Sequence, residues 1–200
     1  MKRALDVAGA LLGLLILCPV IAAAMIAIRL ETPGTALFAQ ARVGRGGRSF
    51  TCYKLRTMHR NTKELPSHEV GAAALTSVGG ILRRFKLDEL PQLYNVLIGE
   101  MSLVGPRPCL PSQTELIEAR RREGALDVRP GITGLAQVQG LDMSDPQLLA
   151  AVDGEYARTR SLAGDILLIL RTATGAGLRV DAARSGDKRL GGGDRKGRAL

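Results

Sequence analysis

The chain has 200 residues, of which three are cysteine, and its formal net charge at pH 7 is +9. This length corresponds to one domain, and the basic excess predicts an anionic partner: nucleic acid, an anionic membrane surface or a phosphorylated ligand. Aromatic residues make up only 3% of the chain, which argues against a base-stacking surface for nucleic acid. The widely spaced Cys18, Cys52 and Cys109 exclude a fully paired disulfide framework, show no metal-binding spacing and favour a reducing compartment.

The N-terminal segment is hydrophobic. Residues 4–30 are apolar except for Asp6 and Arg29, and Lys2 and Arg3 precede them. A helix of this length can cross a hydrocarbon core about 30 Å thick. A full crossing carries its basic residues mainly on the cytoplasmic side, whereas here they stand on both sides of the apolar run. This balance favours a helix that enters and leaves the membrane through the same face.

Pro19 stands near the middle of the hydrophobic segment. A proline inside a helix removes one hydrogen bond and clashes with the preceding turn, so the helix kinks or breaks. We therefore predict a re-entrant membrane helix, broken at Pro19, over residues 1–30. A kinked single span is an alternative. A secretory signal peptide is a further alternative, but the apolar run continues well beyond the alanines at 22–24.

Glycines and alternating residue types next predict a small β-hairpin. Two short strands flank the glycine-rich turn at residues 44–47, and the second alternates over residues 50–55. Lys54 and Arg56 are two residues apart, so in a strand their side chains share one face and are suited to bracket a diphosphate.

Two adjacent carboxylates, Asp88 and Glu89, come just before Pro91 and an apolar helical pattern. Because proline is tolerated only in the first turn of a helix, the pair is expected at or near a helix N-terminus. Unpaired N–H groups and the helix dipole there keep a carboxylate ionised and attract phosphate. An ionised aspartate suits a nucleophile, and the pair suits a Mg²⁺ ligand set. The preceding residues 79–86 predict an amphipathic helix at a membrane surface.

The sequence around this pair is distinctive. Leu-Asp-Glu-Leu-Pro-Gln-Leu at residues 87–93 runs into Asn-Val-Leu at 95–97, and Met-Ser-Leu-Val-Gly-Pro-Arg-Pro follows at 101–108. These blocks resemble the signature of the bacterial sugar transferases, which are monotopic phosphoglycosyl transferases acting on polyprenyl phosphate, here of the small single-domain type. The resemblance extends from the N-terminus to about residue 180.

The resemblance implies a two-step transfer of a phosphosugar from a UDP-sugar, bound with Mg²⁺, to undecaprenyl phosphate. Asp88 would attack the sugar-bearing phosphorus and release UMP, and the aspartyl intermediate would then react with the acceptor. Glu89 would help Asp88 hold Mg²⁺ or take the acceptor's proton. Five basic side chains are expected to neutralise phosphate charge: Lys54, Arg56, Arg83, Arg107 and Arg129.

Two of these arginines stand beside prolines. Pro106 and Pro108 fix the backbone around Arg107, which preorganises its guanidinium for a phosphate. Arg129 opens an Arg-Pro-Gly turn that exposes its side chain. Leu141 departs from the family, which commonly has arginine there, and this casts doubt on one phosphate or sugar contact.

The expected fold is α+β and predominantly helical. Residues 1–30 form the re-entrant helix, residues 31–180 the catalytic sugar transferase domain, and residues 181–200 a disordered basic tail. The catalytic domain combines the small β-hairpin and interfacial amphipathic helices in a globular cytoplasmic part. Residues 166–170 give an apolar helix too short to span, expected to pack in a core or an interface.

The resemblance places the protein on the cytoplasmic face of the inner membrane, as a monotopic enzyme in the first membrane step of glycoconjugate or exopolysaccharide synthesis. Its expected partners are a UDP-sugar, polyprenyl phosphate and membrane lipid, without nucleic acid, and a homodimer is left open. A non-catalytic basic membrane-anchored adaptor is the alternative. An adaptor would leave the Asp88-Glu89 pair and the Pro-Arg-Pro block unexplained.

Overall fold

A computed structural model describes residues 1–59 and 74–175, so the tail predicted for residues 181–200 lies outside the described part. The helices and strands follow in chain order: α1 Lys2–Glu31, β1 Leu37–Val43, β2 Ser49–Leu55, α2 Ser77–Arg84, α3 Gln92–Ile98, β3 Ser102–Val104, α4 Thr114–Arg122, β4 Gly131–Thr133, α5 Leu135–Val138, α6 Pro146–Thr159 and α7 Leu162–Thr174. Short 3-10 turns that lie between them in the described residues are η1 Arg45–Gly47, η3 Leu87–Glu89 and η4 Ala125–Asp127. The predominantly helical prediction is confirmed.

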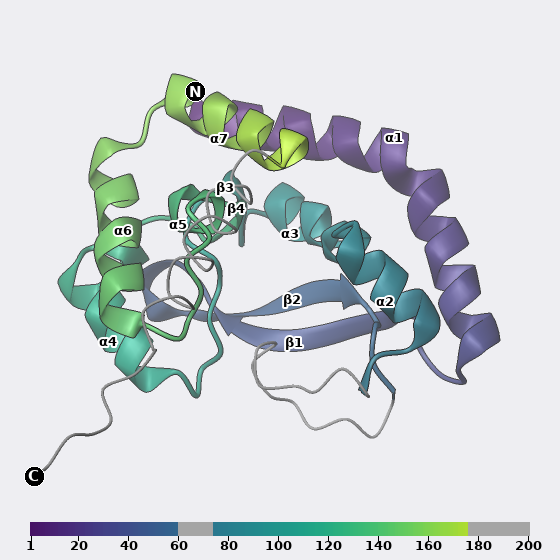
Figure 1. Ribbon diagram of the computed structural model, residues 1–200. Coiled ribbons are helices and arrows are strands. Elements are labelled where there is room, and N and C mark those ends of the chain that lie inside the picture. Colours follow the sequence, from purple (N-terminus) through teal and green to yellow (C-terminus); the bar gives the residue numbers. More distant parts are fainter. Residues whose placement is uncertain (60–73, 176–200) are drawn as a thin grey trace, which may run out of the picture.

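The elements are arranged in levels (Figure 1). Helices α1 and α7 run along one side of the molecule, and the β1–β2 hairpin lies on the opposite side. Helix α3 and the β3–β4 pair lie between these two levels, and α4 and α6 close one end. The segment between α2 and α3, which carries the carboxylate pair, therefore lies between the β1–β2 hairpin and the level formed by α1 and α7.

Helix α1 is continuous through Pro19, so the break predicted there is not what the structure shows. The helix instead bends partway along its length (Figure 1). Proline removes only one backbone hydrogen bond, and a bend relieves its clash with the preceding turn while the other bonds of the ladder persist. By length and composition α1 is apolar enough to cross a membrane.

Both halves of α1 pack on the same globular body. In the first half, Ala10 belongs to a buried cluster with Val96 and Met101. In the second half, Ala24 and Ile28 belong to another cluster, which includes residues of β2 and α2. Asp6 is buried and its Oδ1 accepts a hydrogen bond from Ser102 Oγ at 2.9 Å. The start and the end of α1 are therefore both fixed to the globular part of the chain.

The predicted β-hairpin is confirmed. Strands β1 and β2 pair antiparallel from Leu37 opposite Leu55 to Val43 opposite Ser49. The turn needs glycine, since Gly46 and Gly47 have φ angles of 68° and 77°, a left-handed region in which a Cβ atom is strained.

A second, parallel pair of strands, β3 and β4, was not predicted. Each strand has three residues, too few to show an alternating pattern. Their approach depends on Gly105, where a Cβ atom would lie 2.3 Å from the backbone oxygen of Arg129. This pair brings the Pro-Arg-Pro block next to the Arg-Pro-Gly turn.

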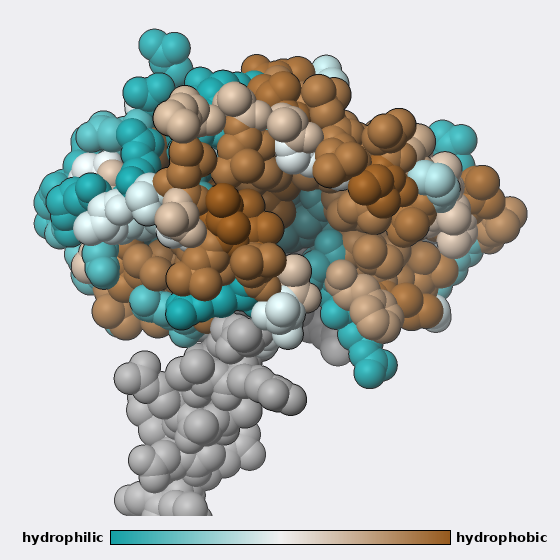
Figure 2. Space-filling model, turned by 90° about the horizontal axis from the view of Figure 1, so that it is seen from above, coloured by the Kyte–Doolittle hydropathy of each residue, from teal (hydrophilic) through white to brown (hydrophobic). Residues whose placement is uncertain are grey.

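One face of the molecule is strongly apolar, as Figure 2 shows from above. It is formed by large exposed hydrophobic side chains of α1 and α7: Leu11, Leu12, Leu15, Ile16, Val20, Ile166, Leu167 and Leu170. A hollow in which hydrophilic residues are visible interrupts this face (Figure 2). Exposed apolar surface on this scale marks a site of interaction with membrane or protein. Residues 166–170 were expected to pack at a core or an interface. In α7, Leu168 is buried and Ile169 packs against the same core cluster, while Ile166, Leu167 and Leu170 are exposed on the apolar face.

Candidate active site

The carboxylate pair lies in the short turn η3, just before α3. Lys86, which precedes the turn, is the one described residue other than glycine with a positive φ, of 55°. This left-handed residue ends α2 and turns the chain toward α3, at a cost of about 1–3 kcal/mol for a side chain with a Cβ atom. The predicted place of the pair, near the start of a helix preceded by Pro91, is confirmed.

Two cations hold the carboxylate of Glu89. Lys54 Nζ donates to Oε1 at 3.0 Å, and the Arg107 guanidinium donates to both carboxylate oxygens. Burial alone would raise the pKa of Glu89, but the charges and hydrogen bonds of Arg107 and Lys54 outweigh it and hold this pKa far below its ordinary value. Glu89 is therefore ionised at every pH at which the protein is expected to work.

Asp88 has the opposite environment. It is only 7% exposed. Burial raises its pKa, and the negative charge of Glu89 raises it further, while the charges of Lys54 and Arg83 offset part of the rise. Neither cation is hydrogen-bonded to Asp88: Lys54 Nζ donates to Glu89, and Arg83 Nε donates to Thr57 Oγ1 at 3.0 Å. A helix N-terminus was expected to keep both carboxylates ionised, whereas the structure raises the pKa of Asp88 and lowers that of Glu89.

Arg83 reaches this site because α2 lies directly against the chain after β2. Gly79 makes the contact: a Cβ atom there would lie 2.0 Å from the backbone oxygen of Thr57. Only glycine permits such a close approach. The β2 strand supplies Lys54 to the same site.

Arg107 is positioned by a buried ion pair that the sequence analysis missed. Arg120 Nη1 donates to the backbone oxygen of Arg107 at 2.9 Å, and Arg120 Nη2 lies 2.6 Å from Asp153 Oδ2. The side chains of Arg120 and Asp153 are only 3% and 2% exposed. Together with the prolines on either side, this pair fixes the backbone from which the Arg107 side chain extends.

The structure does not bring the two remaining predicted phosphate ligands to the carboxylate pair. Arg56 is buried and donates to the backbone oxygens of Thr32 and Pro33 at 2.8 and 2.9 Å, where it closes the C-terminus of α1. Arg129 Nε donates to the backbone oxygen of Gly99 at 2.8 Å, at the far end of α3. Leu141, where the resemblance led us to expect arginine, packs against the core cluster around α4 and α6.

A pocket of about 260 Å³ is lined by Glu89, while its neighbour Asp88 is not among the lining residues. Its walls come from elements far apart in the sequence: Gly13 and Leu17 of α1, Leu93 of α3, and Arg171 and Thr172 of α7. Glu89, Arg107 and Lys86 also line it, so with Arg171 its lining has three basic side chains and one carboxylate. The sequence analysis missed Arg171, because no local pattern shows that the C-terminal helix returns to the site.

The residues present offer Mg²⁺ one carboxylate rather than two. Both oxygens of Glu89 are bonded to cations, whereas the Asp88 carboxylate is bonded to neither Lys54 nor Arg83. Among the described residues, no group of three or more His, Cys, Asp or Glu side chains is arranged to hold a metal ion. Mg²⁺ often binds through one or two carboxylates together with substrate phosphates, so Asp88 fits such a site and Glu89 fits it less well.

Comparisons with known proteins agree with this picture. A family model described as bacterial sugar transferase matches residues 1–177. Over 180 residues the chain is 45% identical to a UDP-glucose:undecaprenyl-phosphate glucose-1-phosphate transferase of Caulobacter vibrioides, covering 86% of this chain and 67% of the relative. It is 36% identical over 181 residues to a UDP-N-acetylgalactosamine-undecaprenyl-phosphate N-acetylgalactosaminephosphotransferase of Aeromonas hydrophila, covering 86% of this chain but 42% of the relative.

A third relative is closer in length. The chain is 34% identical over 188 residues to the exopolysaccharide production protein ExoY of Sinorhizobium fredii, covering 86% of this chain and 83% of the relative. The chain thus spans most of this relative, about two thirds of the Caulobacter protein and less than half of the Aeromonas protein.

Proposed function

Because the chain belongs to the bacterial sugar transferase family, we propose that it transfers a sugar phosphate from a UDP-sugar to undecaprenyl phosphate and releases UMP. The names of two relatives support the acceptor, since both are undecaprenyl-phosphate transferases. Those relatives are named for different donors, UDP-glucose and UDP-N-acetylgalactosamine. The proposal therefore commits to a UDP-sugar and leaves the sugar to experiment.

The observation that carries the proposal is the contrast between two neighbouring carboxylates. Glu89 is paired with two cations and its pKa is held low, while burial and the charge of Glu89 raise the pKa of Asp88. Neighbouring titratable groups whose environments push their pKa values apart are typical of catalytic sites. The pocket that Glu89 lines has walls from α1 and α7, whose outer side chains form the apolar face. A water-soluble donor and a lipid acceptor can meet there.

The chemistry follows in two steps. In the first, an Asp88 carboxylate oxygen attacks the sugar-bearing phosphorus, the bond from that phosphorus to the bridging oxygen breaks, and UMP leaves with the bridging oxygen. In the second, a phosphate oxygen of the acceptor attacks the same phosphorus and the Asp88 carboxylate leaves. Each step exchanges one phosphorus–oxygen bond for another, so Asp88 returns to its starting state.

The basic side chains supply charge for both steps. Phosphoryl transfer depends mainly on positioning and on neutralising phosphate charge, and guanidinium groups are suited to both. Arg83 is electrostatically coupled to Asp88, while Lys54 and Arg107 are held on Glu89. A carboxylate with a pKa this low is a poor general base. We therefore assign Glu89 the role of holding Lys54 and Arg107 in place.

Mg²⁺ is part of the proposal as a partner of the donor. When bound, it offsets charge on the diphosphate. Asp88 is the side chain best placed to hold it, together with oxygens of the donor itself. The protein's own cations, Lys54 of β2, Arg83 of α2 and Arg107 of the Pro-Arg-Pro block, would offset further phosphate charge.

The proposal also includes a monotopic membrane association at the cytoplasmic face of the inner membrane. The monotopic arrangement is supported by the packing of both halves of α1 on one globular body. A straight span would place its two ends on opposite sides of the bilayer, at least about 30 Å apart, and only one end could then contact the globular part. The bend at mid-helix allows α1 to dip into the lipid while both of its ends stay with the catalytic part.

The experiment that tests the function is UMP release from a panel of UDP-sugars by the purified full chain with Mg²⁺. Without acceptor, the two-step route predicts a burst of about one equivalent of UMP per enzyme. With undecaprenyl phosphate, UMP release should become catalytic. No specific observation favours a non-catalytic adaptor. If no UDP-sugar in the panel gave UMP, the transfer reaction would be contradicted and the adaptor would become the better explanation.

A further inference from the structure

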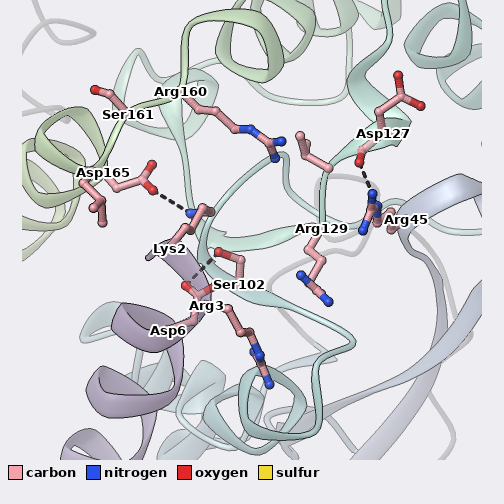
Figure 3. A pocket seen from close by; sticks show the side chains of 12 residues that line it. Lys2, Arg3, Asp6, Arg45, Ser102, Asp127, Arg129, Arg160, Ser161 and Asp165 are labelled. Atoms are coloured by element: carbon pink, nitrogen blue, oxygen red, sulfur yellow. Dashed lines mark hydrogen bonds and ion pairs between the residues drawn. The ribbon is translucent and has the colours of Figure 1, made fainter.

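A second cavity, of about 310 Å³, lies where α1 and α7 begin (Figure 3). We call it the arginine pocket after Arg3, Arg45, Arg129 and Arg160, which line it. Of the described residues that line it, none also lines the pocket beside Asp88 and Glu89. The arginine pocket is therefore a separate feature of the chain, which the proposed transfer reaction does not use.

The pocket is rich in positive charge. Its lining includes five basic side chains, Lys2 and the four arginines, against the three carboxylates of Asp6, Asp127 and Asp165, which leaves an excess of two positive charges. Two of the carboxylates are already bonded in the wall. Asp165 accepts from Lys2 Nζ at 2.6 Å, and Asp6 accepts from Ser102 Oγ at 2.9 Å.

In two of the arginines, Nε makes a hydrogen bond to the protein and the terminal nitrogens remain able to donate to a ligand. Arg45 Nε donates to the backbone oxygen of Asp127, and Arg129 Nε donates to that of Gly99, each at 2.8 Å. A guanidinium has five N–H donors, so each of these groups is fixed at its stem and keeps its terminal nitrogens for another partner. Such preorganised forks match the oxygens of a phosphate.

Arg160 completes this arrangement. Figure 3 shows its side chain extending between Asp165 on α7 and Arg45 at the hairpin turn. It comes from the link between α6 and α7, and within residues 1–59 and 74–175 its guanidinium has no recorded hydrogen bond or ion pair. Gathering like charges costs free energy that a bound anion would offset, so these guanidinium groups are suited to an anionic partner.

The position of the pocket, next to the apolar face, indicates that the anion belongs to a lipid. Leu162, which lines the pocket, starts α7, and Ile166 and Leu167 follow one turn later as exposed apolar side chains. Ile166 and Leu167 belong to the apolar face formed by α1 and α7. A phosphate held by the arginines would leave an attached acyl chain free to lie along α7.

We propose that the arginine pocket binds the phosphate group of an anionic membrane lipid, with Arg45, Arg129 and Arg160 as its donors. The proposal rests on the membrane association described above but not on the transfer reaction. A soluble phosphate shares the same chemistry, so the test separates the two sources.

The test uses the purified full chain in a non-ionic detergent. Native mass spectrometry measures retention of phosphatidylglycerol against phosphatidylcholine, and thermal unfolding measures stabilisation by inorganic phosphate. The variants are Arg160→Gln and the charge reversal Arg160→Glu. Arg158→Gln is the matched control, because Arg158 lies two residues away on α6 and contacts Glu123 outside the pocket. A melt without lipid confirms that each variant is folded.

We expect the wild-type chain and Arg158→Gln to retain phosphatidylglycerol preferentially. Loss of a charged donor should weaken this by about tenfold in Arg160→Gln, and more in Arg160→Glu. The lipid assignment is overturned if inorganic phosphate stabilises the wild type but phosphatidylglycerol is not retained. The whole proposal is overturned if neither ligand binds, or if both Arg160 variants bind as Arg158→Gln does. These experiments measure lipid and phosphate binding and not UMP release. A result that overturns the lipid-binding proposal would therefore not contradict the proposed transfer reaction.

Discussion

Arg107 holds Glu89 through both terminal nitrogens of its guanidinium, and Nη1 lies 3.4 Å from Oε2. The Arg107 side chain is 39% exposed while that of Glu89 is only 12% exposed. In the Arg107–Glu89 ion pair, the ionised carboxylate is therefore buried beside Asp88, while the guanidinium is exposed enough for a donor phosphate to reach it. Glu89 influences Asp88 in two ways, since it holds the nearby cations and its own charge raises the pKa of Asp88.

This relationship gives a prediction for Glu89→Gln. UMP release should fall by about a hundredfold, because Lys54 and Arg107 lose the carboxylate that orients them. Asp88 attacks only when ionised, and the charge of Glu89 raises its pKa. Removing that charge lowers the pKa of Asp88, so the acid limb of the pH profile should move to lower pH. A limb that stays in place or moves to higher pH would contradict the coupling, whatever the loss of rate.

The buried pair of Arg120 and Asp153 gives a second prediction. Asp153→Ala leaves the Arg120 guanidinium buried without its partner and should lower the free energy of unfolding by about 3–5 kcal/mol. Because Arg120 also holds the backbone oxygen of Arg107, the UMP-release rate should fall even at temperatures where the variant is folded. Denaturant unfolding gives the stability, and UMP release well below the midpoint gives the activity.

Glu123→Ala is the control for this variant. Glu123 pairs with Arg158 at 3.6 Å on the surface, with side chains 42% and 60% exposed. An exposed pair of this kind contributes about 0–1 kcal/mol, so stability and UMP release should both stay close to the wild type. If Asp153→Ala and Glu123→Ala lost the same unfolding free energy and the same UMP-release rate, the role assigned to the buried Arg120–Asp153 pair would be contradicted.

The topology of α1 is tested by labelling cysteines in cells. Cys18 is exposed and is first replaced in Cys18→Ser, while Cys52 and Cys109 are buried. Ala4→Cys and Ser112→Cys then report on the start of α1 and on the globular part, at positions that are both exposed. Both should be protected from an impermeant reagent outside the cell and labelled in inverted vesicles. Labelling of Ala4→Cys from outside would show that α1 spans the membrane.

Local features of the sequence predicted local features of the fold. The glycines at 44–47 and the alternation after them were enough to predict the hairpin, because turn chemistry and strand period act within a few residues. Pro91 was enough to predict that Asp88 and Glu89 lie near the start of a helix. The length and composition of residues 4–30 predicted the apolar helix.

Features that depend on contacts between distant residues were missed or placed elsewhere. Arg120 and Asp153 are 33 positions apart, and no pattern marks them as partners. Arg56 and Arg129 carry the same charge as Arg107, but α1 and α3 each end with backbone oxygens that these two arginines satisfy. Charge alone cannot tell an arginine that faces a ligand from one that closes a helix.

Asp88→Asn should leave the fold intact and raise its stability. Burial raises the pKa of Asp88, so the ionised side chain destabilises the folded state at neutral pH, and asparagine removes that penalty. The melting temperature of Asp88→Asn should equal or exceed that of the wild type at neutral pH. The difference should shrink as the pH falls through the raised pKa, because Asp88 then becomes protonated in the wild type too. A lower melting temperature at neutral pH would contradict this.

The most direct measurement of the central claim is the intact mass of the protein after incubation with its UDP-sugar and Mg²⁺ in the absence of acceptor. The account predicts that the wild type gains the mass of one sugar phosphate and loses it when undecaprenyl phosphate is added. Asp88→Asn, folded by the melting test, should gain no mass and release no UMP. A sugar-phosphate adduct on Asp88→Asn, or catalytic UMP release by it, would show that Asp88 is not the nucleophile.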